Sequence, residues 1–264
     1  MYVFRYSVTK PASETFVLHS HNDYEILYFI KGDADYIVEG AVYQLNPHDI
    51  IIVRPYEMHR AFHNSNALYE RVVINISQEF FEKTGCGNYT GAFLNRKAGT
   101  KNKIDAEIAV KCGLVDAYER LKKYTNDYSD VSSPIARAII TEILHIINNT
   151  NAKNSLYENR IQQVISYINS NYRSNITLSS IADEFFVSKS HLSREFHRFT
   201  GYTLTDYVKR KRINGVLAMC RNGKNISDAC YGSGFRDYAS FYRAFFKEYG
   251  KSPKKYIDEM NISK

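Results

Sequence analysis

One short pattern of residues occurs twice in the C-terminal half of this chain, and this repeat constrains the fold more than any other feature. The stretch HLSREFHRFTGYTLTDY (191–207) is similar to SFYRAFFKEYGKSPKKY (240–256), which lies forty-nine residues later. The matched positions keep their chemical type in a fixed order: Leu192 with Phe241, Arg194 with Arg243, Phe196 with Phe245, Gly201 with Gly250 and Tyr207 with Tyr256. This constant register indicates two copies of one structural unit.

Each copy is predicted to be a short helix, a tight turn and a longer helix. Ser188 and Asp237 are suited to cap the longer helices, which end at Gly201 and Gly250. A long helix over about 204–221 joins the copies. This pattern is typical of a double helix-turn-helix, in which each longer helix enters a major groove of DNA. Arg194 and Arg243 stand at matched positions and are predicted to contact guanine.

The charge distribution favours the same interpretation. The chain carries a net charge of +7. Residues 157–264 hold 18 basic and 10 acidic side chains, whereas residues 1–156 hold 17 and 18. All of the excess positive charge therefore lies in the half that contains the repeat, as expected for a domain that binds a polyanion.

The N-terminal half has a different pattern, with short runs rich in β-branched and aromatic residues from Phe4 to about Ser77. Such runs, separated by Gly, Pro, Asn and Asp, predict a sandwich or small barrel. Two helical stripes follow, over 104–121 and 135–147. They can pack on the barrel or present an apolar face to a second subunit, and we favour dimerisation. The polar, Asn-rich segment 148–155 is predicted to be a linker.

The C-terminal half resembles the DNA-binding domain of the AraC/XylS family of transcription regulators. The resemblance covers about 158–258 and is carried by LSSIADEFFVSKSHLSREFHRFTGYTLTDYVKRKRI and GFRDYASFYRAFFKEYGKSPKKY. It departs from the family pattern at Ala229-Cys230 and at Phe186, which occupies a turn position often held by a small residue. The resemblance implies a sequence-specific regulator, more often an activator. Its implied base-reading residues are Ser190, Ser193, Arg194, Tyr238, Ala239, Tyr242 and Arg243.

The barrel carries a histidine pattern that resembles the two cupin motifs. His19, His21 and Glu25 form H-x-H-x3-E, and His59 follows Pro55. In cupin enzymes these four positions hold a divalent metal. The second motif is one residue short here and lacks its glycine, so the sequence favours a pocket without metal. The predicted effector-binding residues are His19, His21, Tyr24, Glu25, Arg54 and His59, and a sugar or another small polar metabolite is the expected effector.

These observations predict two domains: an all-β cupin-like barrel followed by a helical pair, then an all-α double helix-turn-helix. The expected boundaries are 1–100 for the barrel, 101–150 for the helical pair, 151–160 for the linker and 161–260 for the DNA-binding domain. We expect a regulator rather than an enzyme, without catalytic residues or cofactor. The alternatives are a metal-dependent cupin oxygenase or isomerase fused to a DNA-binding domain, and a regulator that needs no ligand.

The expected partners are double-stranded DNA, the small-molecule effector and a second copy of the chain, with RNA polymerase as a further candidate. No membrane partner is expected, because no stretch reaches the roughly 18 apolar residues of a membrane helix. The N-terminus also lacks the pattern of a signal peptide. The four cysteines share no motif spacing, which is typical of reduced thiols in a cytoplasmic protein.

Overall fold

The computed structural model describes residues 2–10, 18–124, 133–150 and 160–262. The chain divides into two compact units, Met1–Glu158 and Asn159–Lys264. The predicted linker at 151–160 lies almost wholly outside the described residues. Among the helices that the structure describes, none combines the length and the apolarity needed to span a bilayer.

The first unit is built on two antiparallel sheets. A five-stranded sheet has the order β1-β7-β2-β5-β8, and a three-stranded sheet has the order β4-β3-β6. The strands are β1 (Tyr2–Thr9), β2 (Tyr24–Lys31), β3 (Ala34–Val38), β4 (Ala41–Gln44), β5 (Ile50–Val53), β6 (His59–His63), β7 (Tyr69–Ile76) and β8 (Lys103–Ile104). An isolated bridge between His19 and His59 ties the segment before β2 to the edge strand β6.

Strand β2 is buried on both faces, which explains its nearly continuous apolar sequence YEILYFIK. Successive strand residues point to opposite faces. Ile26 and Tyr28 contribute to one core between the five-stranded sheet and the helices, while Leu27 and Phe29 contribute to a second core with β3 and β6. The sheet is thus packed on both sides, and only its inner side contributes to the barrel.

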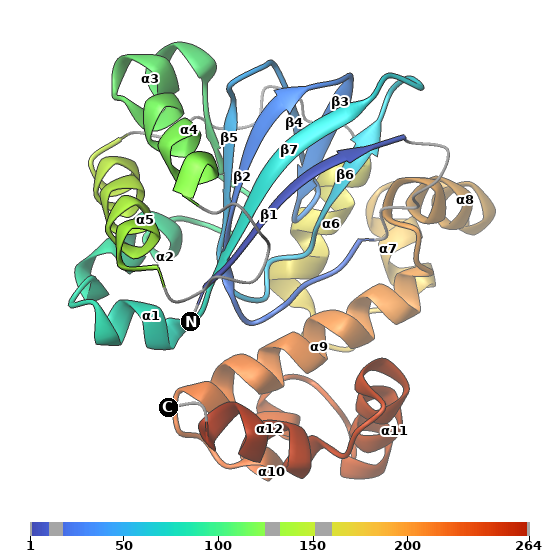
Figure 1. Cartoon of the computed structure of the whole chain (residues 1–264). Helices are drawn as coiled ribbons and strands as arrows, with labels where there is room; N and C mark the ends of the chain where they lie inside the picture. Colours follow the sequence, from blue (N-terminus) through green and yellow to red (C-terminus); the bar gives the residue numbers. More distant parts are fainter. Residues whose placement is uncertain (1, 11–17, 125–132, 151–159, 263–264) are drawn as a thin grey trace. The chain divides into compact units, whose positions relative to one another are not determined.

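Helices cover the outer face of the five-stranded sheet (Figure 1). They are α1 (Gln78–Lys83), η2 (Gly87–Thr90), α2 (Gly91–Leu94), α3 (Ala106–Lys111), α4 (Leu114–Tyr124) and α5 (Pro134–Asn148). The stripe predicted over 104–121 is divided into β8, α3 and α4, because Gly113 adopts a left-handed φ of 80° between the two helices. The apolar faces of α4 and α5 are buried in the sheet core, so they are covered within a single chain.

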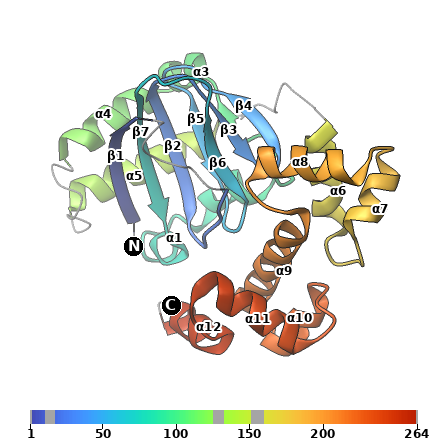
Figure 2. The same ribbon diagram turned by 90° about the vertical axis from the view of Figure 1, so that its right-hand side faces the viewer.

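The second unit is helical throughout its described residues. Its helices are α6 (Arg160–Asn171), α7 (Leu178–Glu184), α8 (Lys189–Thr200), α9 (Leu204–Arg221), α10 (Ile226–Gly232), α11 (Tyr238–Tyr249) and α12 (Pro253–Ile262). Figure 2 shows α9 running from the α7–α8 pair to the α10–α11 pair. The predicted fold class, β-sheets and helices followed by a helical domain with two helix-turn-helix units, is confirmed.

The two copies differ by one residue in the turn. Helix α10 begins forty-eight residues after α7, whereas α11 begins forty-nine residues after α8. In copy one, Val187 alone stands between the left-handed residue Phe186 and the cap Ser188, while copy two has Phe235 and Arg236 between Gly234 and Asp237. Arg236 is thus the added residue, and the forty-nine-residue register holds only from the second helices onward.

Candidate nucleic-acid interface and ligand pocket

Helices α8 and α11 begin and end in the same way. The side chains of Ser188 and Asp237 accept hydrogen bonds from the backbone N–H of His191 and Ser240, three residues into each helix. Gly201 and Gly250 close the helices with left-handed backbones at φ values of 78° and 65°. Each helix has 12 residues, so the matched caps and glycine ends give the two helices the same length.

The apolar side of each helix is fixed in the core. Leu192 and Phe196 are buried in copy one, and Phe241 and Phe245 are buried in copy two. Helical periodicity then directs the intervening positions to solvent. Six of the seven predicted base-reading residues are exposed and Tyr238 is half-buried: Ser190, Ser193 and Arg194 on α8, and Tyr238, Ala239, Tyr242 and Arg243 on α11.

The members of the basic run Lys209–Arg212 on α9 have different surroundings. Arg210 forms an ion pair with Glu248 on α11 and lies 4.2 Å from the ring centroid of Tyr202. Arg212 donates to the backbone carbonyls of Tyr172 and Ser174. These two arginines therefore fix α9 to neighbouring elements, whereas Lys209 is exposed.

The first unit contains a pocket of about 430 Å³ between its two sheets. Its lining combines charged, polar and apolar side chains from five strands and from the segment before β2. The lining residues are Val3, Arg5, Ser7, His19, His21, Asp23, Glu25, Leu27, Tyr36, Ala61, Tyr69, Arg71, Val73 and Asn75. A pocket of this size and mixed polarity is suited to one small ligand.

Four of the predicted residues come together at one end of this pocket. The ligand nitrogens of His19, His21 and His59 lie within 4.8 Å of one another. Glu25 is buried beside them, with its Oε2 3.1 Å from Nε2 of His21 and its Oε1 3.6 Å from Nε2 of His59. Tyr36 also donates a 2.7 Å hydrogen bond to the Glu25 carboxylate.

The hydrogen bonds of the histidine rings determine which nitrogen carries a proton. Nδ1 of His59 lies 2.8 Å from the carbonyl oxygen of Glu57, and Nδ1 of His21 lies 3.2 Å from that of Asp23. A carbonyl oxygen only accepts, so both Nδ1 atoms are donors and both Nε2 atoms face Glu25. A neutral Nε2 and a carboxylate oxygen both carry lone pairs, so they attract each other only when a proton or a metal cation lies between them.

The pKa values of this cluster reflect the same arrangement. Burial alone would raise the pKa of Glu25, but the charge of His59 and the hydrogen bond and charge of His21 hold that pKa well below its ordinary value. Burial alone would lower the pKa of His59, but the Glu25 carboxylate raises it. Burial, followed by the Glu25 charge, raises the pKa of Tyr36. The negative charge of Glu25 is thus buried beside His59 and Tyr36, while His21 is half-buried and His19 is exposed.

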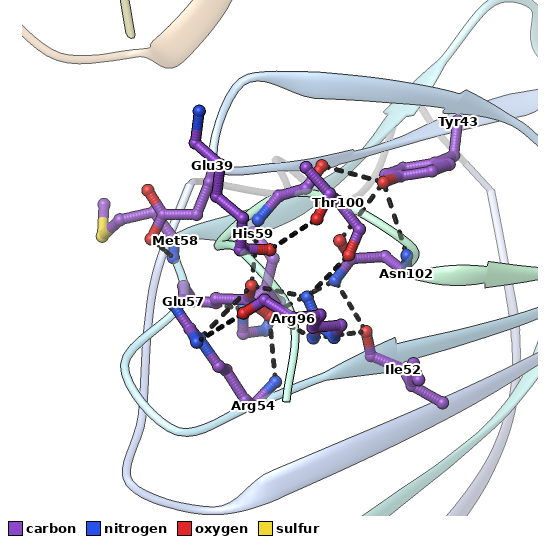
Figure 3. A network of polar contacts seen from close by, with 12 residues as sticks. Glu39, Tyr43, Ile52, Arg54, Glu57, Met58, His59, Arg96, Thr100 and Asn102 are labelled. Atoms are coloured by element: carbon purple, nitrogen blue, oxygen red, sulfur yellow. Dashed lines mark hydrogen bonds and ion pairs between the residues drawn. The ribbon is translucent and has the colours of Figure 1, made fainter. Parts of the chain in front are cut away.

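A second polar network adjoins His59 (Figure 3). The Glu57 carboxylate accepts two charged hydrogen bonds from Arg96, at 2.8 and 2.7 Å, and further bonds from the backbone N–H groups of Arg54 and Gly99. Burial raises the pKa of Glu57, but Arg96 overrides this effect and lowers it. Because the Glu57 carbonyl also accepts the Nδ1 proton of His59, this network fixes the His59 ring beside Glu25.

Three predicted effector residues do not line the pocket: His59, which is buried beside Glu25, and Tyr24 and Arg54, which contact other residues. Tyr24 precedes Glu25 in β2, so it points to the opposite face, where it donates to Gln78 and contacts Phe81. Arg54 donates to the carbonyl of Arg96 beside the Glu57 network. Because strand residues alternate between the two faces of a sheet, the sequence pattern places Tyr24 on the face opposite Glu25. The position of Arg54 depends on the conformation of a loop, which the sequence pattern does not predict.

The sequence motifs did not identify several polar residues of the pocket, among them Arg5, Arg71 and Asn75. Arg5, Arg71 and Asn75 lie on the adjacent strands β1 and β7 and face the same interior. Asn75 donates a 3.0 Å hydrogen bond to Oε2 of Glu25. The available signal was the alternation of Arg71, Val73 and Asn75 with the buried residues Val72, Ile74 and Ile76.

Comparisons with known proteins match a domain family to each of the two units. Residues 2–92 match the family described as an AraC-like ligand binding domain, and residues 181–259 match a helix-turn-helix domain. The HTH-type transcriptional activator RhaS of Shigella boydii is 21% identical over 243 residues, which cover 89% of this chain and 85% of RhaS. RhaS of Escherichia coli matches with the same identity and coverage.

Solved structures of similar proteins were also found. ToxT from Vibrio cholerae bound to an unsaturated fatty acid has a TM-score of 0.40 and 14% identity, covering 97% of this chain and 94% of its own. A protein from Listeria innocua has a TM-score of 0.36 and 29% identity, covering 38% of this chain and 97% of its own. The two family matches together span more than half of the chain, and RhaS aligns across both. The chain belongs to the AraC/XylS family of transcription regulators, with an N-terminal ligand-binding domain and a C-terminal DNA-binding domain.

Proposed function

We propose that α8 and α11 read two adjacent major grooves through Ser190, Ser193, Arg194, Tyr238, Ala239, Tyr242 and Arg243. The observation that carries this proposal is the matched exposure of Arg194 and Arg243 on identically capped helices. The 18 residues of α9 rise about 27 Å, close to the roughly 34 Å between successive grooves on one side of DNA. One connector can therefore hold both helices near the required spacing.

The pocket of the first unit is the proposed effector site. His19, His21 and Glu25 supply hydrogen-bonding groups at one end, and the buried His59 supports the Glu25 carboxylate there. A sugar or another small polar metabolite is the proposed ligand class, because the lining offers donors and acceptors next to the apolar surfaces of Leu27 and Val73. Binding changes the output only if the ligand prefers one of two arrangements of the protein.

We further propose that the protein forms a homodimer, contacts RNA polymerase and acts as an activator. RhaS is named a transcriptional activator, and the family resemblance supports the same direction here. Because the main apolar faces of α4 and α5 are covered within one chain, a dimer would use other parts of these helices, where Ile135 is exposed. Action on the chromosome places the protein in the cytoplasm.

Divalent metal binding by His19, His21, Glu25 and His59 is a second candidate property. Nε2 of His59 is buried without a hydrogen-bond partner, while its Nδ1 donates to a carbonyl, an arrangement common to metal-binding histidines. The donor set fits Fe, Mn, Ni or Zn. Such a metal would supply a Lewis-acid contact for an effector oxygen. The matched families and named relatives favour a regulator over the fused-enzyme alternative.

Selection of bound sequences from a random DNA library tests the proposed function. The unaltered chain should enrich a site with two conserved blocks about one helical turn apart. Arg194→Ala and Arg243→Ala should each weaken binding to that site by about 1–3 kcal/mol and relax the preference at one base. Unchanged preference in both variants would show that other residues read the bases.

A thermal-shift screen of sugars and organic acids tests the effector site, and a stabilising compound should lose its effect in Glu25→Gln.

A further inference from the structure

A cleft of about 480 Å³ lies between α9 and α11, within the DNA-binding unit. One wall comes from the start of α9 and the residue before its cap, and the other from α11. The lining residues are Tyr202, Asp206, Lys209, Arg210, Ile213, Ser240, Arg243, Ala244, Lys247 and Glu248. The cleft therefore adjoins the exposed side of the proposed reading helix α11 and includes its Arg243.

The acidic residues of the cleft already have partners. Glu248 forms its ion pair with Arg210, whose guanidinium also lies over the ring of Tyr202. The Asp206 carboxylate accepts a 2.8 Å hydrogen bond from the hydroxyl of Thr203, which caps α9. The two carboxylates thus serve to hold α9 against α11 and to fix the start of α9.

The basic residues of the cleft are less engaged. Lys209 and Lys247 are both exposed. Lys209 lies 3.9 Å from Asp206, at the limit of an ion pair, and Lys247 has no ion-pair partner among the residues that the structure describes. Arg243 donates a long 3.4 Å hydrogen bond to Ser240, and its charge contributes to lowering the pKa of Asp237, but it forms no close ion pair with any residue that the structure describes. Three positive charges therefore line the cleft without strong neutralising contacts, which favours an anionic occupant.

We propose that this cleft binds the phosphate backbone of DNA beside the groove entered by α11, with Lys209 and Lys247 as phosphate-binding residues. The inference rests on the proposed function. The occupant is DNA because the cleft is continuous with the reading face of α11, and phosphates border the major groove that this helix would enter. Flexible lysine ammonium groups suit contact with phosphate as point charges, without base preference.

The arrangement assigns distinct tasks to neighbouring residues. Arg243 is placed for base recognition, whereas Lys209 and Lys247 set how α11 sits on the duplex. The Arg210–Glu248 ion pair holds the two walls of the cleft together. Only one member of the basic run on α9 then contacts DNA.

The test measures the affinity of the full chain for a short duplex of mixed sequence as a function of KCl concentration. Each phosphate contact contributes roughly 0.9 to the slope of log K against log salt. Lys209→Gln and Lys247→Gln should each lower the slope by about that amount and weaken binding equally for the selected site and for mixed DNA. Lys211→Gln is the matched control, because a residue two positions along a helix points about 200° away.

The outcomes separate this inference from the proposed function. Slopes for Lys209→Gln and Lys247→Gln that equal that of the unaltered chain, or that fall no more than in Lys211→Gln, would overturn the cleft assignment while leaving DNA reading intact. Failure of the unaltered chain to bind any DNA would overturn both. Charge reversal in Lys247→Glu should weaken binding more than Lys247→Gln, and the absence of that order would also contradict the inference.

Discussion

Phe186 and Gly234 occupy the same position in the turns of the two helix-turn-helix units, and both have left-handed backbones, with φ values of 53° and 90°. Their surroundings differ. The side chain of Phe186 is 96% exposed. A Cβ atom on Gly234 would lie 2.5 Å from the carbonyl oxygen of Arg173. The repeated unit thus tolerates a large residue in one turn and requires glycine in the other.

Gly234→Ala should destabilise the second unit strongly. A left-handed backbone costs a residue with a Cβ roughly 1–2 kcal/mol, and the contact with Arg173 adds a backbone clash that no side-chain rotation relieves. Gly223→Ala is the matched control, because Gly223 has a φ of 85° with open space around its Cβ position. Urea unfolding should show the larger loss for Gly234→Ala, and equal losses would contradict the clash.

Phe186→Gly should leave stability nearly unchanged. The exposed ring buries little apolar surface, and the relief of left-handed strain is offset by the roughly 0.5–1 kcal/mol of backbone entropy that glycine loses on folding. Phe235→Ala provides the comparison, because Phe235 is 7% exposed and packs 5.3 Å from the ring of Phe241. Its loss should cost about 3–5 kcal/mol. A large loss in Phe186→Gly would show that the exposed ring has a partner in solution.

The sequence predicted the second unit more fully than the first because its signals are local. Caps such as Ser188 and Asp237, the terminal Gly201 and Gly250, and the apolar spacing of each helix all act within a few residues. The repeat in the sequence covers only the second helix of each unit, so it does not reveal the added residue Arg236 in the preceding turn. A one-residue turn insertion leaves each helix pattern intact and shifts only the register between them.

The pocket was predicted only in part because it depends on contacts between distant residues. The histidine motif identified His19, His21, Glu25 and His59, which the structure brings together. Glu57 and Arg96 are thirty-nine residues apart and meet only after the loop before β8 folds back on the sheet. No local sequence pattern predicts a buried ion pair of this kind, because charged residues in loops are most often exposed to solvent.

Arg96→Ala should destabilise the first unit by about 3–5 kcal/mol, because it leaves the Glu57 carboxylate buried without its charged partner. Both side chains are nearly inaccessible, at 3% and 1% exposure. Arg120→Ala is the control, since the Arg120–Glu142 pair is 45% and 47% exposed and should contribute about 1 kcal/mol or less. Thermal unfolding compares the variants. Similar small losses in both would mean that the Glu57 network does not fix the loop.

Metal analysis decides whether the histidine cluster is a cation site. Titration of chelator-treated protein with Zn²⁺, Mn²⁺ or Ni²⁺ in a calorimeter should show one site per chain. His59→Ala should abolish that site, because Nε2 of His59 is the buried donor aimed at Glu25. His145→Gln is the control, as His145 lies on α5 beside Tyr89, outside the pocket. If His59 has only a structural role, His59→Ala should change the stability of the protein, and the unaltered chain should show no heat of metal binding. The absence of saturable binding by the unaltered chain would leave His59 as a protonated partner of Glu25, and the pocket as a site for organic ligands only.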